Sequence, residues 1–311
     1  MTAADYLNLL ISALLLAGTY AAMAVGMTVI YGVMKIVNLA HAGFLMLGAY
    51  FVYELHERAG INPLVGVLLA FPVFFFAGVL VHWVLGRGIP VSDEPTLASL
   101  LLMFGLWLVL QNIGYLVWGT SDRSILTPMT FATIRFGEIT IPRVGLVVFA
   151  GAVLSLAMLE IILHKTWFGR SVRALIQNRY ACRIVGVNVA HTARMTFGLG
   201  ISFAGAAGGL LALLYPFSPD FGRPFLLRSF VIIVLGGLES FSGVFIGALI
   251  LSLVETFSIL VIPSSYQPAI SFSLLVVALI VLPGGVAGFF AHIRSRGAAR
   301  RAARAIVSEA K

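Results

Sequence analysis

Long apolar runs, separated by short polar segments, occupy most of this chain. A helix needs about 20 mainly apolar residues to cross a bilayer core of about 30 Å. Nine segments are candidates for helices in a membrane, and they cover approximately residues 6–34, 41–53, 63–85, 97–118, 144–163, 196–215, 225–235, 244–262 and 269–282. The pattern predicts an all-α fold, that of a polytopic α-helical membrane protein.

One of these segments, residues 225–235, is too short to cross a membrane. The glycine-rich stretch Gly236–Ser240 follows it, and the apolar segment 244–262 then leads back. Glycine permits the backbone to turn sharply at membrane depth. The sequence therefore predicts about eight transmembrane helices plus one re-entrant half-helix.

Small residues recur at helical spacing in several segments, as at Gly26, along residues 198–209, and at Gly243 and Gly247. Helices in lipid pack mainly through such small faces, because the hydrophobic effect drives little association there. We therefore expect a bundle whose helices cross with their backbones in close contact.

The composition excludes a soluble protein. Hydrophobic residues make up 60% of the 311 residues and charged residues 10%, and the mean hydropathy is +1.04. Soluble domains have about 25% charged residues. Cys182 is the single cysteine of the sequence, so no disulfide can form within the chain.

The positive charge is concentrated in two places. The net charge is +8. Six Lys or Arg residues and no acidic residue lie within 164–194, and six more lie with one acidic residue within 291–311. Short basic segments beside apolar runs are typical of cytoplasmic loops. If residues 164–194 are cytoplasmic, one crossing by the segment 144–163 places residues 119–143 outside. We predict a transmembrane domain over 1–290 and a basic cytoplasmic tail over 291–311. We expect the basic segments to contact membrane lipid and not nucleic acid.

The segment Arg170–Val187 is the most regular polar part of the chain. Apolar side chains recur there at helical spacing, arginines fill many of the other positions, and Gly186 stands near the end as a stop signal. This pattern predicts one amphipathic helix. Such a helix either lies on the anionic inner leaflet or docks into a groove of a cytoplasmic partner.

Sequence motifs for catalysis are absent. The sequence has no phosphate-binding loop, no His-Glu-x-x-His zinc pair, no nucleophile elbow and no pair of cysteines. We therefore expect no enzyme activity, cofactor or metal site in this chain. If ATP drives the protein, another chain hydrolyses it.

Ionisable residues within the apolar segments are candidate functional sites, because burying a charge in a bilayer costs about 2.5–3.5 kcal/mol. Glu255 lies near the middle of its segment, and Glu239 lies in the predicted turn. Glu255 either accepts an interhelical hydrogen bond or lines a pathway. His82 and Glu160 lie near segment ends, where snorkelling to the interface is the simpler explanation.

Three ordered blocks of sequence resemble the permease subunits of branched-chain amino acid ABC transporters. The first block consists of Tyr31, Gly32, Asn38, Ala40, His41, Gly43 and Met46-Leu47-Gly48-Ala49-Tyr50. It departs from the family at Ala42, where relatives commonly have Gly directly after the His.

The other two blocks lie in the second half of the chain. Arg173-Ala174, Ala181 and Gly186-Val187-Asn188 are similar to the segment that engages the ATPase. The stretch Val234–Gly243, continued by Gly247 and Glu255, is similar to the C-terminal block, with Glu239 in place of the usual third glycine. The similarity spans about residues 6–288.

The resemblance implies a subunit of the bacterial inner membrane that pairs with a second, homologous permease chain. Two cytoplasmic ATPase subunits bind the ATP in such a system, and a periplasmic binding protein delivers the substrate. That substrate is a branched-chain amino acid or, as in some relatives, an amide, urea, a short peptide or an aromatic acid. The resemblance also favours the docking interpretation of Arg170–Val187.

Two sets of residues follow from the motifs and the resemblance. Those expected to couple this chain to the ATPase are Arg170, Arg173, Ala174, Arg179, Ala181, Arg183 and Gly186. Those expected along the translocation pathway are Asn38, His41, Gly43, Gly236, Gly237, Glu239, Ser240 and Glu255.

An ion-coupled secondary transporter is the main alternative, with Glu255 and His41 forming an ion or proton site near broken helices. Such a protein works without an ATPase and leaves the amphipathic segment without an obvious role. A membrane enzyme that uses His41 and His82 is a further alternative, but no carboxylate stands at a useful spacing from them.

Overall fold

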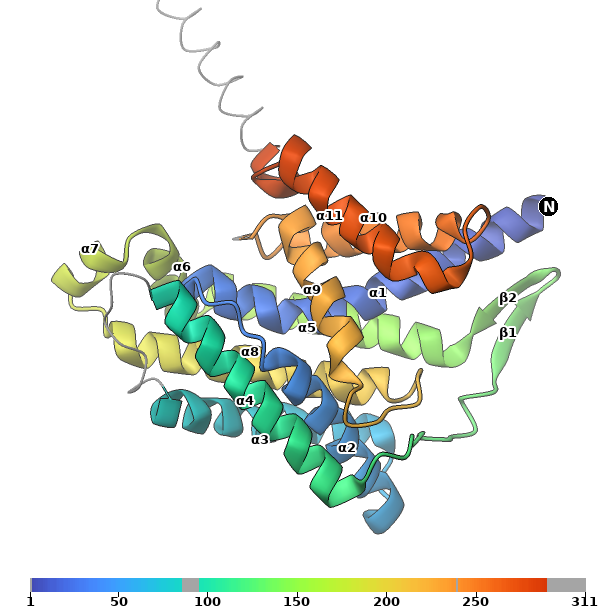
Figure 1. Ribbon diagram of the computed structural model, residues 1–311, viewed down its shortest axis with the longest axis horizontal. Coiled ribbons are helices and arrows are strands. Elements are labelled where there is room, and N and C mark those ends of the chain that lie inside the picture. The colour runs from blue at the N-terminus through green and yellow to red at the C-terminus, as the bar shows by residue number, and fades with distance from the viewer. Residues whose placement is uncertain (1, 86–94, 239, 290–311) are drawn as a thin grey trace, which may run out of the picture.

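Helices form most of the computed structural model, which describes residues 2–85, 95–238 and 240–289 (Figure 1). Each of the nine apolar segments is a helix there. These helices are α1 (Ala3–Met34), α2 (His41–Ala59), α3 (Pro63–Leu85), α4 (Pro95–Trp118), α5 (Arg143–Lys165), α8 (Val189–Leu211), α9 (Gly222–Gly236), α10 (Gly243–Ser258) and α11 (Gln267–Val281). The predicted basic tail, 291–311, lies outside the described residues.

Five segments of the described chain are long and apolar enough to cross a membrane by length and composition. They are Ala3–Met34, Pro63–Leu85, Leu97–Trp118, Arg143–Lys165 and Ser264–Phe289. The helix α1 is about 48 Å long at 1.5 Å per residue, which exceeds a bilayer core of about 30 Å.

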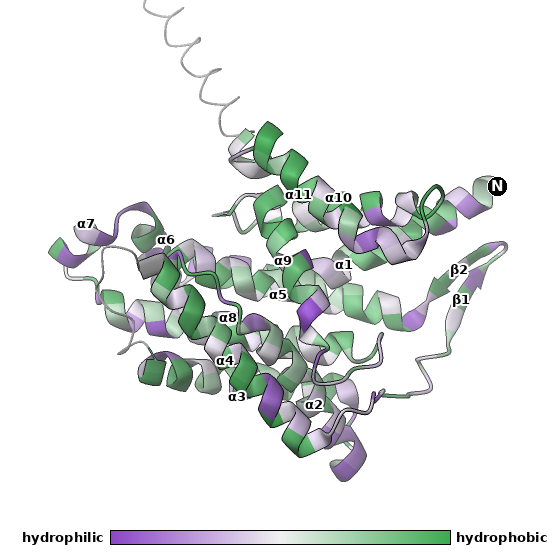
Figure 2. Cartoon of the chain, viewed as in Figure 1, coloured by the Kyte–Doolittle hydropathy of each residue, from purple (hydrophilic) through white to green (hydrophobic). Residues whose placement is uncertain are grey.

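The helix α1 lies at the centre of the bundle. Every residue from 17 to 30 is buried, and α5, α8, α9 and α10 all contact this helix. By contrast, α3 and α4 present exposed leucines such as Leu68 and Leu116. Figure 2 shows hydrophobic residues along most helices and hydrophilic ones gathered at α7, the β1–β2 hairpin and the end of α2. The molecule thus has an apolar body with polar ends.

Small residues let the helices cross closely, as predicted. A methyl group on Gly26 of α1 would overlap the carbonyl oxygen of Gly200 in α8. A methyl group on Gly247 of α10 would likewise overlap the carbonyl oxygen of Ile232 in α9. Direct backbone contact through glycine therefore sets both crossings.

The fold is mostly helical, as predicted, and one β-hairpin adds to it. Strands β1 (Thr133–Phe136) and β2 (Ile139–Pro142) pair antiparallel within the region that the sequence analysis treated as a plain outer loop. Alternating β-branched residues favour strands, and a two-residue connection with Gly137 at φ 62° suits a tight hairpin. Asn8 of α1 donates to the Glu138 carbonyl and accepts from the Thr140 amide, both at 3.0 Å.

The prediction of one amphipathic helix over Arg170–Val187 is wrong. Two helices occupy this region, α6 (Trp167–Gln177) and α7 (Arg179–Ile184). Asn178 separates them in an extended conformation, and its side chain accepts hydrogen bonds from the Tyr180 and Ala181 amides at 3.0 and 2.9 Å. Asparagine is a preferred residue at a helix start, so it begins a new helix here.

Candidate functional site

The backbone is non-helical between α1 and α2. Lys35 ends α1 in the left-handed conformation, with φ 55°. The chain then returns along α1, and His41 at the start of α2 donates from Nε2 to the Met23 carbonyl at 2.7 Å. The start of α2 therefore lies level with the middle of α1. Non-helical backbone at membrane depth requires protein or a water-filled cavity around it.

Three predicted pathway residues, Asn38, His41 and Gly43, lie in or beside this break, and all are buried. Neither polar atom of the Asn38 amide, nor Nδ1 of His41, has a hydrogen-bond partner among the described residues. A methyl group on Gly43 would lie 2.8 Å from the Leu110 side chain of α4. These residues lie inside the bundle and line no open surface.

The helix α9 connects this break to the rest of the candidate residues. Its first residue, Gly222, packs so closely on Ala42 that a methyl group there would overlap the Ala42 carbonyl. Its last residue, Gly236, packs in the same way on Gly243 at the start of α10. Figure 1 shows α9 crossing α1 steeply.

A buried ion pair lies beside the middle of α1. Nε of Arg228 in α9 donates to Oε1 of Glu255 in α10 at 3.2 Å. The hydroxyl groups of Tyr20 in α1 and Ser271 in α11 also donate to the Glu255 carboxylate, whose side chain is 0% exposed. A lone buried charge is costly, whereas a paired and hydrogen-bonded one is tolerated. One carboxylate thus ties four helices together.

This geometry supports the interhelical interpretation of Glu255. The sequence analysis missed its partners Tyr20, Arg228 and Ser271. One signal was present for Arg228, because it is a positive charge inside the apolar run 225–235 and could pair with an intramembrane Glu. No comparable signal marks Tyr20 or Ser271.

The glycine-rich turn between α9 and α10 contains Gly236, Gly237 and Ser240. Gly237 has φ 106°, a conformation that favours glycine. Oγ of Ser240 accepts a hydrogen bond from the Gly243 amide at 3.1 Å and so closes the turn. Glu239, also predicted for the pathway, lies outside the described residues.

The predicted coupling residues divide into two groups. Two of them are half-buried, Arg173 and Ala174, and Arg173 donates to the Leu163 carbonyl at the end of α5. The remaining five are exposed, namely Arg170, Arg179, Ala181, Arg183 and Gly186. Arg173 therefore holds α6 against α5, whereas the other arginines are accessible.

Apolar side chains also divide between the two short helices. Val172 and Leu175 of α6 are buried against the bundle. Tyr180, Ile184 and Val185, on α7 and its end, are 73%, 72% and 75% exposed. An outward apolar face therefore lies on α7, with Arg179 and Arg183 beside it, and Trp167 at the start of α6 is also exposed.

The opposite end of the molecule carries an aromatic cluster. The Tyr50 and Trp118 rings stack with centroids 4.2 Å apart, and Phe217 packs edge-on against Tyr50. Arg123 donates to the Tyr53 hydroxyl at 3.2 Å, and this hydrogen bond raises the pKa of Arg123. Backbone pairing of Arg123 with Phe217 joins the loops after α4 and α8 at this end.

Within the described ranges, no group of three or more His, Cys, Asp or Glu residues is arranged to hold a metal ion. The buried polar chemistry is instead that of helix contact around a central span. An apolar body, polar ends and irregular backbone inside the bundle are together typical of a multi-pass membrane protein.

The chain belongs to the family described as branched-chain amino acid transport system / permease component, whose family model matches residues 9–282. The match covers the nine apolar segments except for the first three residues of segment 6–34. No solved structure matches the chain.

Curated relatives are similar over most of the chain. It is 28% identical to the high-affinity branched-chain amino acid transport system permease protein BraD of Pseudomonas aeruginosa, over 91% of this chain and 96% of BraD. It is 29% identical to the permease protein LivH of Escherichia coli K12, with the same coverage. Similarity to LivM of that strain is 27% identity over 75% of this chain and 59% of LivM.

Proposed function

We propose that this chain is a permease subunit of an ABC importer and forms part of the translocation pathway for branched-chain amino acids. Membership of the permease family and the names of BraD and LivH support this function over an ion-coupled transporter. The chain itself hydrolyses no ATP, and partner subunits bind the nucleotide. The substrate moves through the bundle unchanged.

The exposed face of α7 carries the coupling part of the proposal. An apolar patch of Tyr180, Ile184 and Val185, flanked by Arg179 and Arg183, suits a groove of a cytoplasmic ATPase. The fixed helix α6 then transmits the motion of α7 to the bundle. A helix that lies on the inner leaflet has its apolar side chains on one face and its charges on the other. The exposed apolar and charged side chains of α7 instead lie together at the tip of the molecule, which favours a protein partner.

The other partners follow from the relatives. LivH and LivM are named as permease proteins of one kind of transport system, and this chain is similar to both. We therefore propose that it pairs with a homologous second permease in the bacterial inner membrane. A periplasmic binding protein docks at the end that carries the hairpin. Within the membrane we propose eight spanning helices, with α9 as the re-entrant half-helix.

Cysteine cross-linking tests this arrangement in the assembled transporter. Ile184→Cys should cross-link to an ATPase subunit, and Glu138→Cys in the hairpin should react with a membrane-impermeant thiol reagent added outside intact cells. Labelling of Ile184→Cys from outside, or its failure to contact an ATPase while the complex is assembled, would contradict the proposal. The buried native Cys182 makes a suitable Cys182→Ser background.

A further inference from the structure

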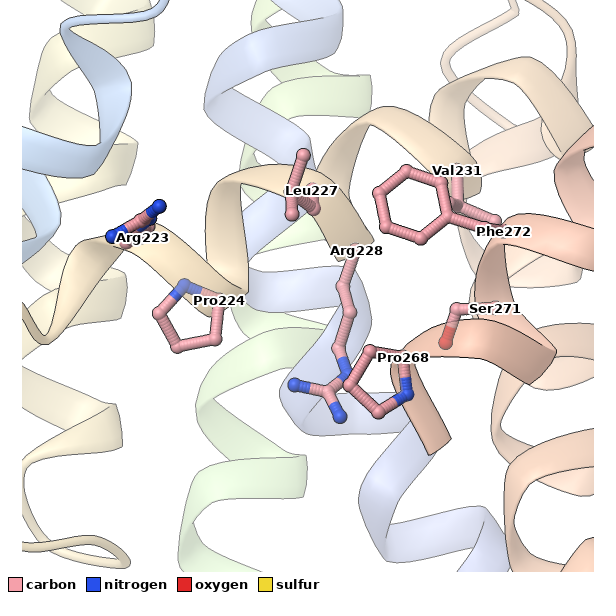
Figure 3. A pocket seen from close by; sticks show the side chains of 8 residues that line it. All are labelled: Arg223, Pro224, Leu227, Arg228, Val231, Pro268, Ser271 and Phe272. Atoms are coloured by element: carbon pink, nitrogen blue, oxygen red, sulfur yellow. The ribbon is translucent and has the colours of Figure 1, made fainter. Parts of the chain in front are cut away.

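A cavity of about 220 Å³ opens between α9 and α11 beside the ion pair (Figure 3). The apolar wall consists of Pro224, Leu227, Val231, Pro268 and Phe272, and the polar groups come from Arg223, Arg228 and Ser271. A mostly apolar pocket with a few converging polar groups is typical of small-molecule sites. Its volume lies below the roughly 300–1,000 Å³ of pockets for drug-sized ligands, which suits a ligand with few heavy atoms.

The Arg228 guanidinium lies over the Tyr20 ring, 5.8 Å from its centroid, and bonds Glu255 through one nitrogen. Its Nε donates to Glu255, and the side chain is 18% exposed. Among the described residues no hydrogen bond is recorded for its two terminal nitrogens. In Figure 3 the guanidinium lies between Pro224 and Pro268, with Leu227, Val231 and Phe272 above it. The end of a guanidinium that carries two terminal nitrogens is a bidentate partner for a carboxylate.

The charges that line the cavity favour a ligand with a carboxylate. Arg223 and Arg228 both line it, whereas the Glu255 carboxylate is fully buried and is not part of the lining. A zwitterion adds no net charge in the membrane, where an excess charge is costly. The Arg228–Glu255 pair contacts Tyr20, near the middle of α1, so the cavity lies at a depth that a crossing substrate must pass.

We propose that this cavity is a transit site for the transported amino acid. The carboxylate of the ligand binds the two terminal nitrogens of Arg228, and its branched side chain packs against Leu227, Val231 and Phe272. Ser271 and Tyr20 position Glu255, which in turn orients the guanidinium. This inference rests on the proposed function, because it assumes that the chain transports branched-chain amino acids.

Photolabelling tests the location. The complete transporter, with second permease, ATPases and binding protein, is placed in liposomes with ATP and a diazirine analogue of leucine. We expect labelled peptides from residues 223–231 or 268–272. Labelling elsewhere in the complex, with none in these segments, overturns the site. A second outcome also overturns the site. If phosphatidylglycerol prevents the labelling and Arg228→Lys releases bound phosphatidylglycerol, the cavity binds a lipid headgroup.

Two variants test the chemistry. Leu227→Trp fills the cavity and leaves the Arg228–Glu255 pair intact, whereas Arg228→Lys keeps the charge but loses the bidentate end. Each should lower leucine uptake at least tenfold with unchanged assembly of the complex. The matched control Leu68→Trp, on the exposed face of α3, should transport like the unsubstituted protein. Normal uptake by both variants overturns the site.

The same experiment separates this inference from the proposed function. If the unsubstituted complex takes up no leucine with ATP, the proposed function fails. If it takes up leucine and both cavity variants do so equally well, the function stands and only the transit site is removed.

Discussion

Ile176 of α6 and Phe241 of the glycine-rich turn lie against the same residue, Gly32 of α1. A methyl group on Gly32 would lie 3.5 Å from Cζ of Phe241 and 3.9 Å from Cδ1 of Ile176. The helix α6 and the α9–α10 turn therefore both pack near the end of α1. Since α9 carries Arg228, we propose that this packing links α6 and α7 to the ion pair.

Truncation at this junction should uncouple ATP hydrolysis from transport. We expect Ile176→Ala and Phe241→Ala each to reduce the coupling free energy by about 0.5–2 kcal/mol, seen as fewer leucine molecules transported per ATP hydrolysed. The double variant should lose less than the sum of the two, because both residues act through one contact. Full additivity, or an equal effect from Ile161→Ala on the exposed side of α5, would argue against this link.

Glycine substitutions should differ according to what each new methyl group meets. Gly26→Ala pushes a methyl group into the Gly200 carbonyl and should lower stability by about 1–3 kcal/mol. Gly32→Ala meets side chains at ordinary contact distance and should change stability little. Thermal unfolding of the purified protein in detergent measures both, and equal stability of the two variants would contradict the packing described for α1 and α8.

Two substitutions in α6 and α7 should affect two different properties, association with the ATPase and stability. Ile184→Asp changes an exposed residue of α7 and should abolish association with the ATPase without lowering the unfolding temperature. Arg173→Glu removes the hydrogen bond to the Leu163 carbonyl and should lower the unfolding temperature. Co-purification and thermal unfolding measure the two effects, and retention of the ATPase by Ile184→Asp would show that α7 is not the docking face.

Removal of Glu255 should destabilise the protein strongly. Glu255→Ala leaves Arg228 buried without its partner and should cost about 3–5 kcal/mol. Tyr20→Phe removes one hydrogen bond in a membrane setting and should cost about 0.6–1.7 kcal/mol. Refolding equilibria in detergent measure both, and Glu255→Ala combined with Arg228→Met should recover part of the loss. No recovery would mean that Glu255 contributes through contacts other than the ion pair.

Helix positions could be predicted because membrane insertion depends on long apolar runs, a property of consecutive residues. All nine apolar segments, including the short one at 225–235, are helices in the structure. The break at Asn178 was missed because helical spacing of apolar residues continued across it, while the capping by the Asn178 side chain is a local effect. The hairpin was missed because its strands have only four residues each.

The partners within the candidate site could not be predicted from one sequence. Tyr20, Arg228, Glu255 and Ser271 lie on four helices, and only tertiary packing brings them to one carboxylate. The exposed face of α7 was likewise hidden, because the pattern of residues 170–187 does not say which apolar positions face the bundle. Glu255 could be singled out, since a charge inside an apolar run is visible in sequence.

Leucine uptake into proteoliposomes tests the central claim most directly. We predict that this chain transports leucine only when assembled with its second permease, binding protein and ATPase subunits, and only with ATP on the ATPase side. Uptake by the purified chain alone, driven by a proton or sodium gradient and independent of ATP, would contradict the account.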